Sequence, residues 1–211
     1  MKFSEWFSKY DYFLLDLDDT LYDEKLYLYP AYRVIAKDLA AVNHIDAGKV
    51  EKFLIRTFEQ EGRDKLFNKL CKTFQVSETL IPCMLETLRT NTPEKKLPLK
   101  PGVISLLQRL AAEEKKIFLI TNGNLQQQKN KVMQIDWRGF LQHITVIYTA
   151  LHQPKPSRAA FDFLVRQYGV HPERAVMIGD SETDSEFAIN SGISFTHSTI
   201  FSSADFIQEI C

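Results

Sequence analysis

A short apolar run that ends in a group of carboxylates constrains the fold of this chain most strongly. Residues 12–15 are aromatic or aliphatic, as expected of a strand buried on both faces. Asp16, Asp18 and Asp19 follow within four positions, so we predict a strand over 11–16 that runs into a polar loop. Open α/β sheets bind ligands at loops of this kind, at the carboxyl ends of parallel strands. Taken alone, however, a D-x-D sequence is more typical of an acidic surface turn, and the rest of the chain has to decide between the two.

Strand patterns alternate with helical patterns through the second half of the chain. Apolar or β-branched runs predict further strands within 116–123 and at 143–148, 175–180 and 193–196. Helices are predicted at 103–110 and 125–133, from Ser157 onward, around 187–189 and at 204–210. This alternation predicts an α/β fold with a doubly wound, Rossmann-like parallel sheet that is covered by helices on both faces.

The segment from about 26 to 97 shows helical patterns only. Gly62 is predicted to separate two helices, and Ser77 to cap another, although Pro82 fits the first turn of that helix poorly. Because no strand pattern interrupts the segment, we predict an all-helical domain at 23–96, inserted into an α/β core domain made of 1–22 and 97–211.

Composition and charge narrow the possible partners. The formal net charge is −1, so we expect neither a nucleic acid polymer nor a membrane surface as partner. No apolar run approaches the about 20 residues of a membrane span. Cys71, Cys83 and Cys211 lack the spacing of metal ligands and are expected to be reduced thiols in a cytoplasmic protein. The sequence leaves the choice between a monomer and a homodimer open.

Polar residues follow the predicted strands at several points. All carboxyl ends of a parallel sheet lie at one edge, so residues far apart in sequence converge there. This convergence is the main argument against an ordinary acidic turn. The residues concerned are Asp16 and Asp18, Thr121 and Asn122, Lys155, and Asp180 with Asp184.

These residue types match the needs of phosphoryl transfer from a monoester. The reaction requires a nucleophile, a proton donor for the leaving oxygen, a metal, and positive or N–H groups for the phosphoryl oxygens. Asp16 is the candidate nucleophile, which would form an aspartyl-phosphate, and Asp18 is the candidate acid and base. Asp180 would complete a Mg²⁺ site, because hard carboxylate oxygens suit this ion. The Thr121 hydroxyl, the Asn122 backbone N–H and the Lys155 ammonium are candidates for binding the phosphoryl oxygens.

The four segments, in this order, resemble the motifs of the haloacid dehalogenase superfamily of phosphohydrolases. The family motifs are D-x-D-x-T, a Thr or Ser at a strand end, a lysine, and G-D-x-x-x-D. The matching segments are Asp16-Leu17-Asp18-Asp19-Thr20, Ile120-Thr121-Asn122-Gly123, Lys155-Pro156 and Gly179-Asp180-Ser181-Glu182-Thr183-Asp184. The helical insert resembles the cap of the family's first subgroup, so the resemblance covers nearly the whole chain.

The resemblance implies a role for each matching residue. Asp16 would be nucleophile and metal ligand, and Asp18 would be acid and base and would bind the metal through its backbone carbonyl. Asp180 would bind Mg²⁺. Asp184 would assist the metal site through water or by orienting Lys155. Thr121, Asn122 and Lys155 would hold the phosphoryl group.

Asp18 also separates activities within the family. Its dehalogenases lack this second aspartate, because a halide leaves without a proton. The chain therefore resembles a phosphatase or a phosphomutase, and the first expectation is a Mg²⁺-dependent phosphomonoesterase. Its substrate would be a small phosphorylated metabolite of the phosphoglycolate, nucleotide or sugar-phosphate type. A non-catalytic binding protein on a retired hydrolase fold is a third hypothesis. Asp19 receives no role.

Overall fold

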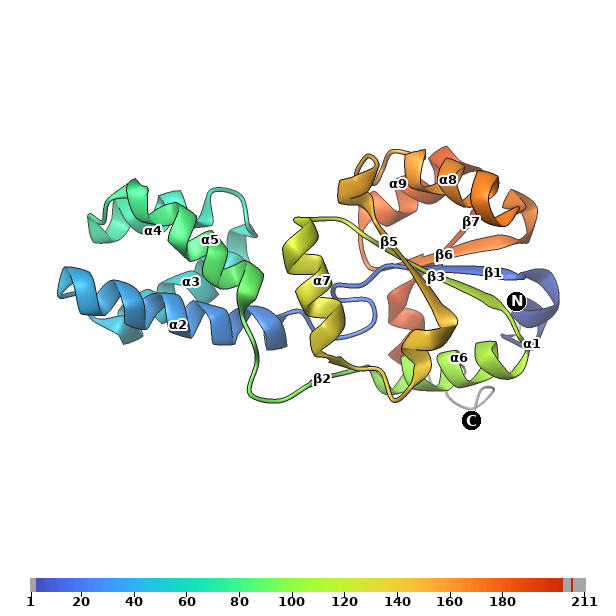
Figure 1. The fold of residues 1–211 in the computed structure, drawn as a ribbon, viewed down its shortest axis with the longest axis horizontal. Coiled ribbons are helices and arrows are strands. Elements are labelled where there is room, and N and C mark those ends of the chain that lie inside the picture. Colours follow the sequence, from blue (N-terminus) through green and yellow to red (C-terminus); the bar gives the residue numbers. More distant parts are fainter. Residues whose placement is uncertain (1–2, 203–205, 207–211) are drawn as a thin grey trace. The chain divides into compact units, whose positions relative to one another are not determined.

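The computed structural model describes residues 3–202 and 206, and these form two compact units. Among the described residues, the core unit contains 3–23, 97–128, 135–202 and 206. The helical unit contains Glu24–Lys96 together with Lys129–Gln134 (Figure 1). The assignment of these units as functional domains stays a prediction.

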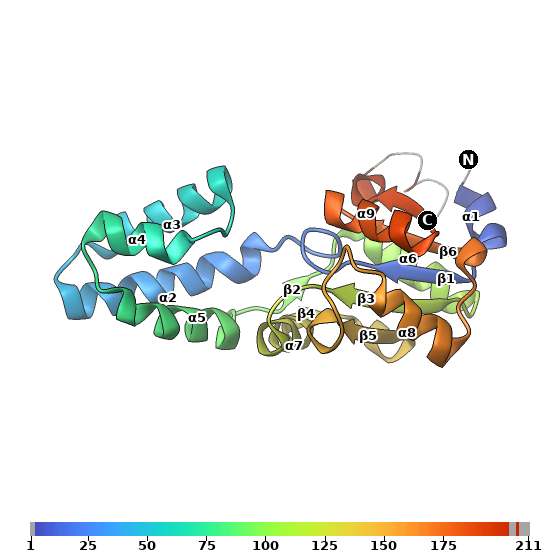
Figure 2. The same ribbon diagram turned by 90° about the horizontal axis from the view of Figure 1, so that it is seen from above.

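The core unit is built on a five-stranded sheet in the order β5-β3-β1-β6-β7. The central strand β1 (Tyr12–Leu15) lies between β3 (Lys116–Thr121) and β6 (Ala175–Gly179) (Figure 2). The outer strands are β5 (Ile144–Tyr148) and β7 (Ser194–His197). Every neighbouring pair is parallel. The predicted fold class, a parallel α/β sheet with an inserted helical segment, is therefore confirmed.

Helices cover both faces of this sheet. The helices α8 (Ala159–Tyr168) and α9 (Glu182–Ser191) lie over one face, and α6 (Pro101–Ala112) lies over the other (Figure 1). Leu14, Phe118 and Met177 pack with Phe161 and Phe187 on the α8–α9 side. Because both faces are buried, the strands carry continuous apolar runs instead of alternating ones.

Three further elements of the core unit are short. The helix α1 (Phe3–Lys9) precedes β1, and Phe7 stacks on Phe13. The two-residue strands β2 (Leu97–Pro98) and β4 (Ile135–Asp136) form a separate parallel pair. Sequence patterns predict neither of them, because two residues carry no periodicity. The helix predicted at 204–210 lies outside the described residues, apart from Phe206, and so does Cys211.

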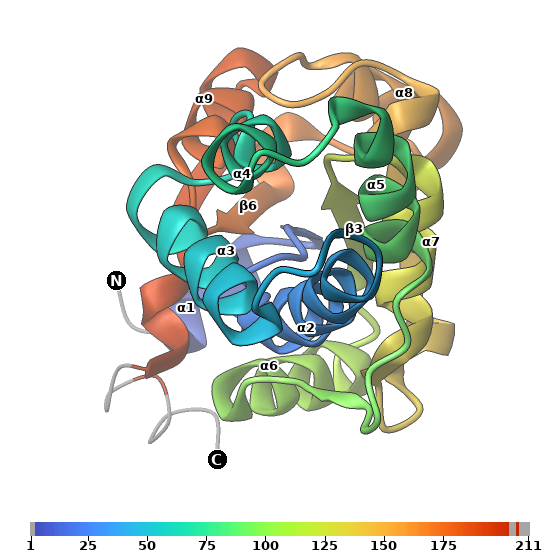
Figure 3. The same ribbon diagram turned by 90° about the vertical axis from the view of Figure 1, so that its left-hand side faces the viewer.

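The helical unit contains α2 (Lys25–Asn43), α3 (Ala47–Glu61), α4 (Leu66–Phe74) and α5 (Ile81–Thr90), seen end-on in Figure 3. Gly62 ends α3 at φ 74°, which confirms the predicted break. Ser77 caps a short 3₁₀ turn at Glu78–Leu80 and not α5 itself, so α5 begins only at Ile81. Pro82 therefore lies in the first turn of α5, where a missing N–H costs nothing.

Two further properties bear on the expectations from composition. None of the helices in the described part of the chain combines the length and apolar character of a membrane span. Cys71 is a buried free thiol and Cys83 an exposed one.

Candidate active site

The first carboxylate, Asp16, directly follows the central strand. Its backbone N–H donates to the Ile178 carbonyl at 2.9 Å, so the strand pairing extends one residue beyond β1. The side chain is only 8% exposed. A buried aspartate at the carboxyl end of the central strand occupies the position where open α/β sheets bind ligands.

Lys155 joins Asp16 to Asp184. The Lys155 Nζ lies 2.6 Å from Asp16 Oδ1 and 2.5 Å from Asp184 Oδ1. All three side chains are buried. Burial by itself lowers the pKa of Lys155, but the two carboxylates raise it more, and the net pKa lies above the ordinary value. The ammonium is therefore charged, and it binds two acids that lie 168 positions apart in the sequence.

The ion pairs of Lys155 thus hold Asp16 and Asp184 together at one edge of the sheet.

The local sequence explains how Asp184 reaches this position. Ser181 and Asp184 form a capping box at the start of α9, in which the Ser181 hydroxyl donates to Asp184 Oδ2 at 2.6 Å. A Cβ atom on Gly179 would lie 2.5 Å from the Asp184 side chain. The G-D-x-x-x-D spacing therefore combines a helix cap with the close approach of Asp184 to the end of β6.

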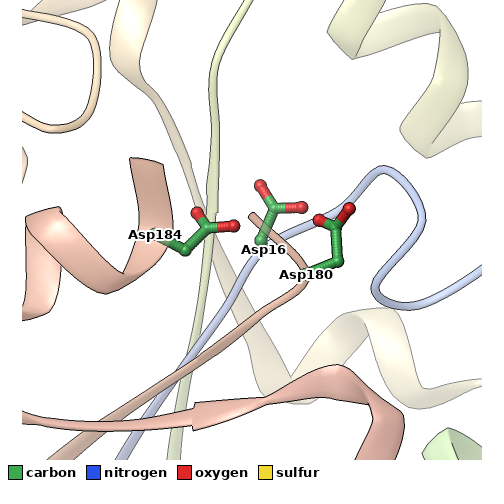
Figure 4. A group of neighbouring side chains, drawn as sticks. All are labelled: Asp16, Asp180 and Asp184. Atoms are coloured by element: carbon green, nitrogen blue, oxygen red, sulfur yellow. The ribbon is translucent and has the colours of Figure 1, made fainter. Parts of the chain in front are cut away.

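Asp16, Asp180 and Asp184 form a cluster whose nearest carboxylate oxygens all lie within 4.8 Å of one another (Figure 4). The Thr20 hydroxyl donates to Asp180 Oδ1 at 3.2 Å. Burial raises the pKa of Asp16, which Lys155 opposes, and burial together with Asp184 raises the pKa of Asp180. Three carboxylates lie close together here and Lys155 pairs with two of them, Asp16 and Asp184, so the donor set fits a divalent cation with oxygen ligands.

Asn122 holds the segment that carries Lys155. Its side-chain oxygen accepts from the Lys155 N–H at 2.8 Å and from the Thr149 hydroxyl at 2.9 Å. Its amide nitrogen donates to the Lys155 carbonyl at 3.0 Å. Thr121 is buried at the end of β3. The Asn122 side chain thus has a positioning role that the sequence did not suggest, since only its backbone N–H was a candidate.

Asp18 lies in the loop after Asp16 and is bound by two side chains. The Tyr22 hydroxyl donates to Asp18 Oδ1 at 2.7 Å, and Gln128 Nε2 donates to Asp18 Oδ2 at 3.2 Å. Sequence reasoning missed both contacts, and it also missed the bond from Thr20 to Asp180. Asp19 adopts a left-handed conformation with φ 55°, and its carbonyl accepts from Lys100. Asp19 therefore shapes the turn, and aspartate tolerates this conformation better than most residues.

Direct contacts join four of the predicted site residues: Asp16, Asn122, Lys155 and Asp184. Ion pairs join Lys155 to Asp16 and Asp184, and hydrogen bonds join the Lys155 backbone to Asn122. The arrangement offers a buried carboxylate beside an ammonium and further acids at one sheet edge.

Known proteins show the same sequence pattern and the same fold. The model of the haloacid dehalogenase-like hydrolase family matches residues 13–197. A glyceraldehyde 3-phosphate phosphatase of Methanothermobacter thermautotrophicus is 28% identical over 189 residues, which cover 85% of this chain and 81% of that protein. The human N-acylneuraminate-9-phosphatase is 29% identical over 85 residues, 40% of this chain and 34% of that protein.

A solved structure extends the likeness to the fold. The putative hydrolase YfnB of Bacillus subtilis, bound to magnesium, gives a TM-score of 0.65 at 21% identity, over 89% of this chain and 86% of that one. The family model spans most of the chain, including all the segments that carry the site. The chain belongs to the haloacid dehalogenase-like hydrolase family.

Proposed function

We propose that this protein is a Mg²⁺-dependent phosphomonoesterase that acts on a small phosphorylated metabolite. The observation that carries the proposal is the contact of buried Asp16 with Lys155, beside Asp180, at the carboxyl end of the central strand. Phosphatases among the relatives support it.

Asp16 is the proposed nucleophile. One of its carboxylate oxygens attacks the phosphorus atom, the bond from phosphorus to the leaving oxygen breaks, and an aspartyl-phosphate forms on Asp16. The Lys155 ammonium, the Thr121 hydroxyl and the Asn122 backbone N–H are proposed to bind the phosphoryl oxygens, where negative charge accumulates.

Asp18 is the proposed acid and base. It gives a proton to the leaving oxygen in the first step and removes a proton from the attacking water in the second. Water then attacks the phosphorus atom, which releases inorganic phosphate and restores the Asp16 carboxylate. The fixed placement of Asp18 by two hydrogen bonds supports this role.

The residues present fit a Mg²⁺ ion. Asp16 and Asp180 are the proposed carboxylate ligands, together with the backbone carbonyl of Asp18. Asp184 uses one oxygen for Lys155 and the other for Ser181, which favours an indirect role at the metal site. When bound, the ion would offset the repulsion between the Asp16 carboxylate and the anionic substrate.

The helical unit is the proposed cap domain, which would select the substrate and exclude water. The names of the relatives favour the sugar-phosphate type over the phosphoglycolate and nucleotide types.

The proposal is tested by phosphate release from a panel of esters, with Mg²⁺ and with a chelator. The panel contains glyceraldehyde 3-phosphate, N-acylneuraminate 9-phosphate, sugar monophosphates, phosphoglycolate and nucleoside monophosphates. We expect Mg²⁺-dependent release from at least one ester and a loss of at least about a thousandfold in Asp16→Asn. Isomerised sugar phosphate without free phosphate would indicate a phosphomutase, and no turnover at all would indicate a binding protein. Either result would overturn the proposal.

A further inference from the structure

Asp18 is bound by side chains from two separate segments of the core unit. We infer that Tyr22 and Gln128 are positioning residues that orient the Asp18 carboxyl group for proton transfer to the leaving oxygen. This inference rests on the proposed function, in which Asp18 is the acid.

Each oxygen of Asp18 has its own donor. Tyr22 donates to Oδ1 at 2.7 Å, and Gln128 donates to Oδ2 at 3.2 Å. Tyr22 is 0% exposed and Gln128 is 2% exposed. Water competes little with hydrogen bonds in such surroundings, so these two contacts fix both the position and the rotation of the carboxyl group.

The loop conformation brings Tyr22 back to Asp18. The Leu21 N–H donates to the Leu17 carbonyl at 3.0 Å, and Asp18 and Tyr22 form an isolated β-bridge. The left-handed conformation of Asp19 lets the chain turn between them. The hydroxyl four residues after the acid is therefore part of the same tight turn.

Gln128 reaches Asp18 from α7 (Leu125–Gln134). The Asn124 side chain caps this helix by accepting from the N–H groups of Gln126 and Gln127, which fixes its first turn. Gly123 has φ 125°, and a Cβ atom there would lie 2.7 Å from Gln128 Nε2. The glycine therefore leaves the space that the glutamine amide occupies.

The amide of Gln128 also connects the acid to the end of β3. Its Nε2 donates to the Asn122 carbonyl at 2.8 Å as well as to Asp18. Its Oε1 is buried and has no hydrogen-bond partner among the described residues. A buried acceptor without a partner is unfavourable, and an apolar side chain would fill the same space without that cost. The donated bonds, and not packing, account for a glutamine at this position.

Two substrates with different leaving groups can distinguish a positioning role of Tyr22 and Gln128 from a purely structural one. An alkoxide leaves poorly without a proton, whereas p-nitrophenolate is stable without one. Proton transfer by a well-placed acid contributes about 10²–10⁴-fold to such reactions. Misplacing Asp18 should therefore slow alkyl phosphate hydrolysis much more than p-nitrophenyl phosphate hydrolysis.

The test measures kcat and KM for p-nitrophenyl phosphate and for an alkyl phosphate that the wild type hydrolyses. The variants are Tyr22→Phe, Gln128→Met and their combination, with Asp18→Asn as the reference for complete loss of the acid. Tyr29→Phe and Gln127→Met are matched controls, because Tyr29 donates to Glu59 in the helical unit and Gln127 precedes Gln128 on α7.

We expect each single variant to lower kcat for the alkyl ester by about 10- to 100-fold, part of the contribution of a general acid. We expect changes below about threefold for p-nitrophenyl phosphate, unchanged KM, and controls like the wild type. Equal losses on both esters, or no loss on either, would overturn the inference while the proposed function stands. A wild type that hydrolyses neither ester would overturn the proposed function, and the inference with it.

Discussion

Lys155 binds two buried carboxylates, so the free energy of the fold depends on all three charges together. Removing one partner of a buried ion pair leaves an uncompensated charge in a medium that solvates it poorly. With Lys155 absent, Asp16 and Asp184 would also repel each other, because the lysine lies between them.

We therefore predict that Lys155→Met lowers the free energy of unfolding by about 3–5 kcal/mol in the presence of a chelator. Urea unfolding measures this change. Lys116→Met is the control, because Lys116 is exposed at the start of β3, and a surface substitution of this kind changes stability by about 0.5 kcal/mol or less. Adding Asp184→Asn to Lys155→Met should recover part of the loss. Equal effects of the two lysine substitutions would show that the buried ion pairs of Lys155 do not stabilise the fold.

The sequence predicted which candidate residues lie near one another better than it predicted the side chains that hold them in place. Parallel strands end at one edge of a sheet, so the convergence of polar residues at and after the strand ends could be inferred. These residues are Thr121, which ends β3, and Asp16, Asp18, Lys155 and Asp180, which follow strands. The hydrogen bond between Gln128 and Asp18 joins residues 110 positions apart, and no local sequence pattern indicates it. The one available signal was Asn124, a residue type that caps helices and that places Gln128 in the first turn of α7.

A second cluster of charged side chains joins the amino ends of the three central strands, β1, β3 and β6. Asp11 precedes β1, Arg174 precedes β6 and Lys115 precedes β3. Arg174 Nε and Nη2 each lie 2.7 Å from an Asp11 oxygen, and Lys115 Nζ lies 3.3 Å from Oδ1. The hydrogen bonds from Arg174 hold the pKa of Asp11 below its ordinary value, which burial opposes and Lys115 assists.

This pKa shift predicts a pH-dependent contribution to stability. Asp11 loses its proton more readily in the folded state than in the unfolded chain. Its pairing therefore stabilises the fold above the unfolded pKa of about 3.9, and the contribution is lost as the pH falls through the lower folded pKa. Asp11→Asn should cost less than about 1 kcal/mol at neutral pH, because solvent screens this cluster, and nothing at strongly acidic pH.

Urea unfolding of Asp11→Asn and of the wild type measures this difference. The measurements run from about pH 2 to about pH 7, so that they span the titration of carboxyl groups. Glu5→Gln, which removes an exposed carboxylate from α1, is the control. A stability difference that persists or grows at low pH would argue against the assigned sign.

The start of α7 gives a prediction about a single element. Asn124 accepts from two N–H groups that no residue of the helix can satisfy. Asn124→Ala should destabilise the protein by about 0.5–2 kcal/mol, whereas Asn124→Ser should cost less, because serine is also a good cap. Denaturant midpoints measure both changes, and equal losses in the two variants would show that the cap bond does not matter.

At the scale of the whole molecule, the chain forms two units that differ in their fold and in their buried charges. In the helical unit, the buried Glu24 carboxylate accepts from Lys131 at 2.5 Å and from Arg63. Lys131 is 0% exposed. The sequence predicted the helices of this unit but not this pair, because the two residues lie 107 positions apart.

Glu24→Gln should therefore destabilise the helical unit selectively, by up to about 3–5 kcal/mol, because the buried Lys131 ammonium loses the Glu24 carboxylate. Both tryptophans, Trp6 and Trp137, belong to the core unit, so their fluorescence reports on that unit. Far-UV circular dichroism reports on the helices of both. We expect the dichroism midpoint to fall more than the fluorescence midpoint. Glu59→Gln, at an exposed ion pair of the same unit, is the control, and equal shifts of the two signals would mean that the units unfold as one.

In the proposed reaction, Asp16 carries the phosphoryl group during turnover. Acid quenching during turnover of a hydrolysed ester, followed by mass spectrometry of the peptide that contains residue 16, tests this step. We expect one phosphoryl group on Asp16 in the wild type and none in Asp16→Asn. A phosphoryl group on another residue, or turnover that persists in Asp16→Asn, would contradict it.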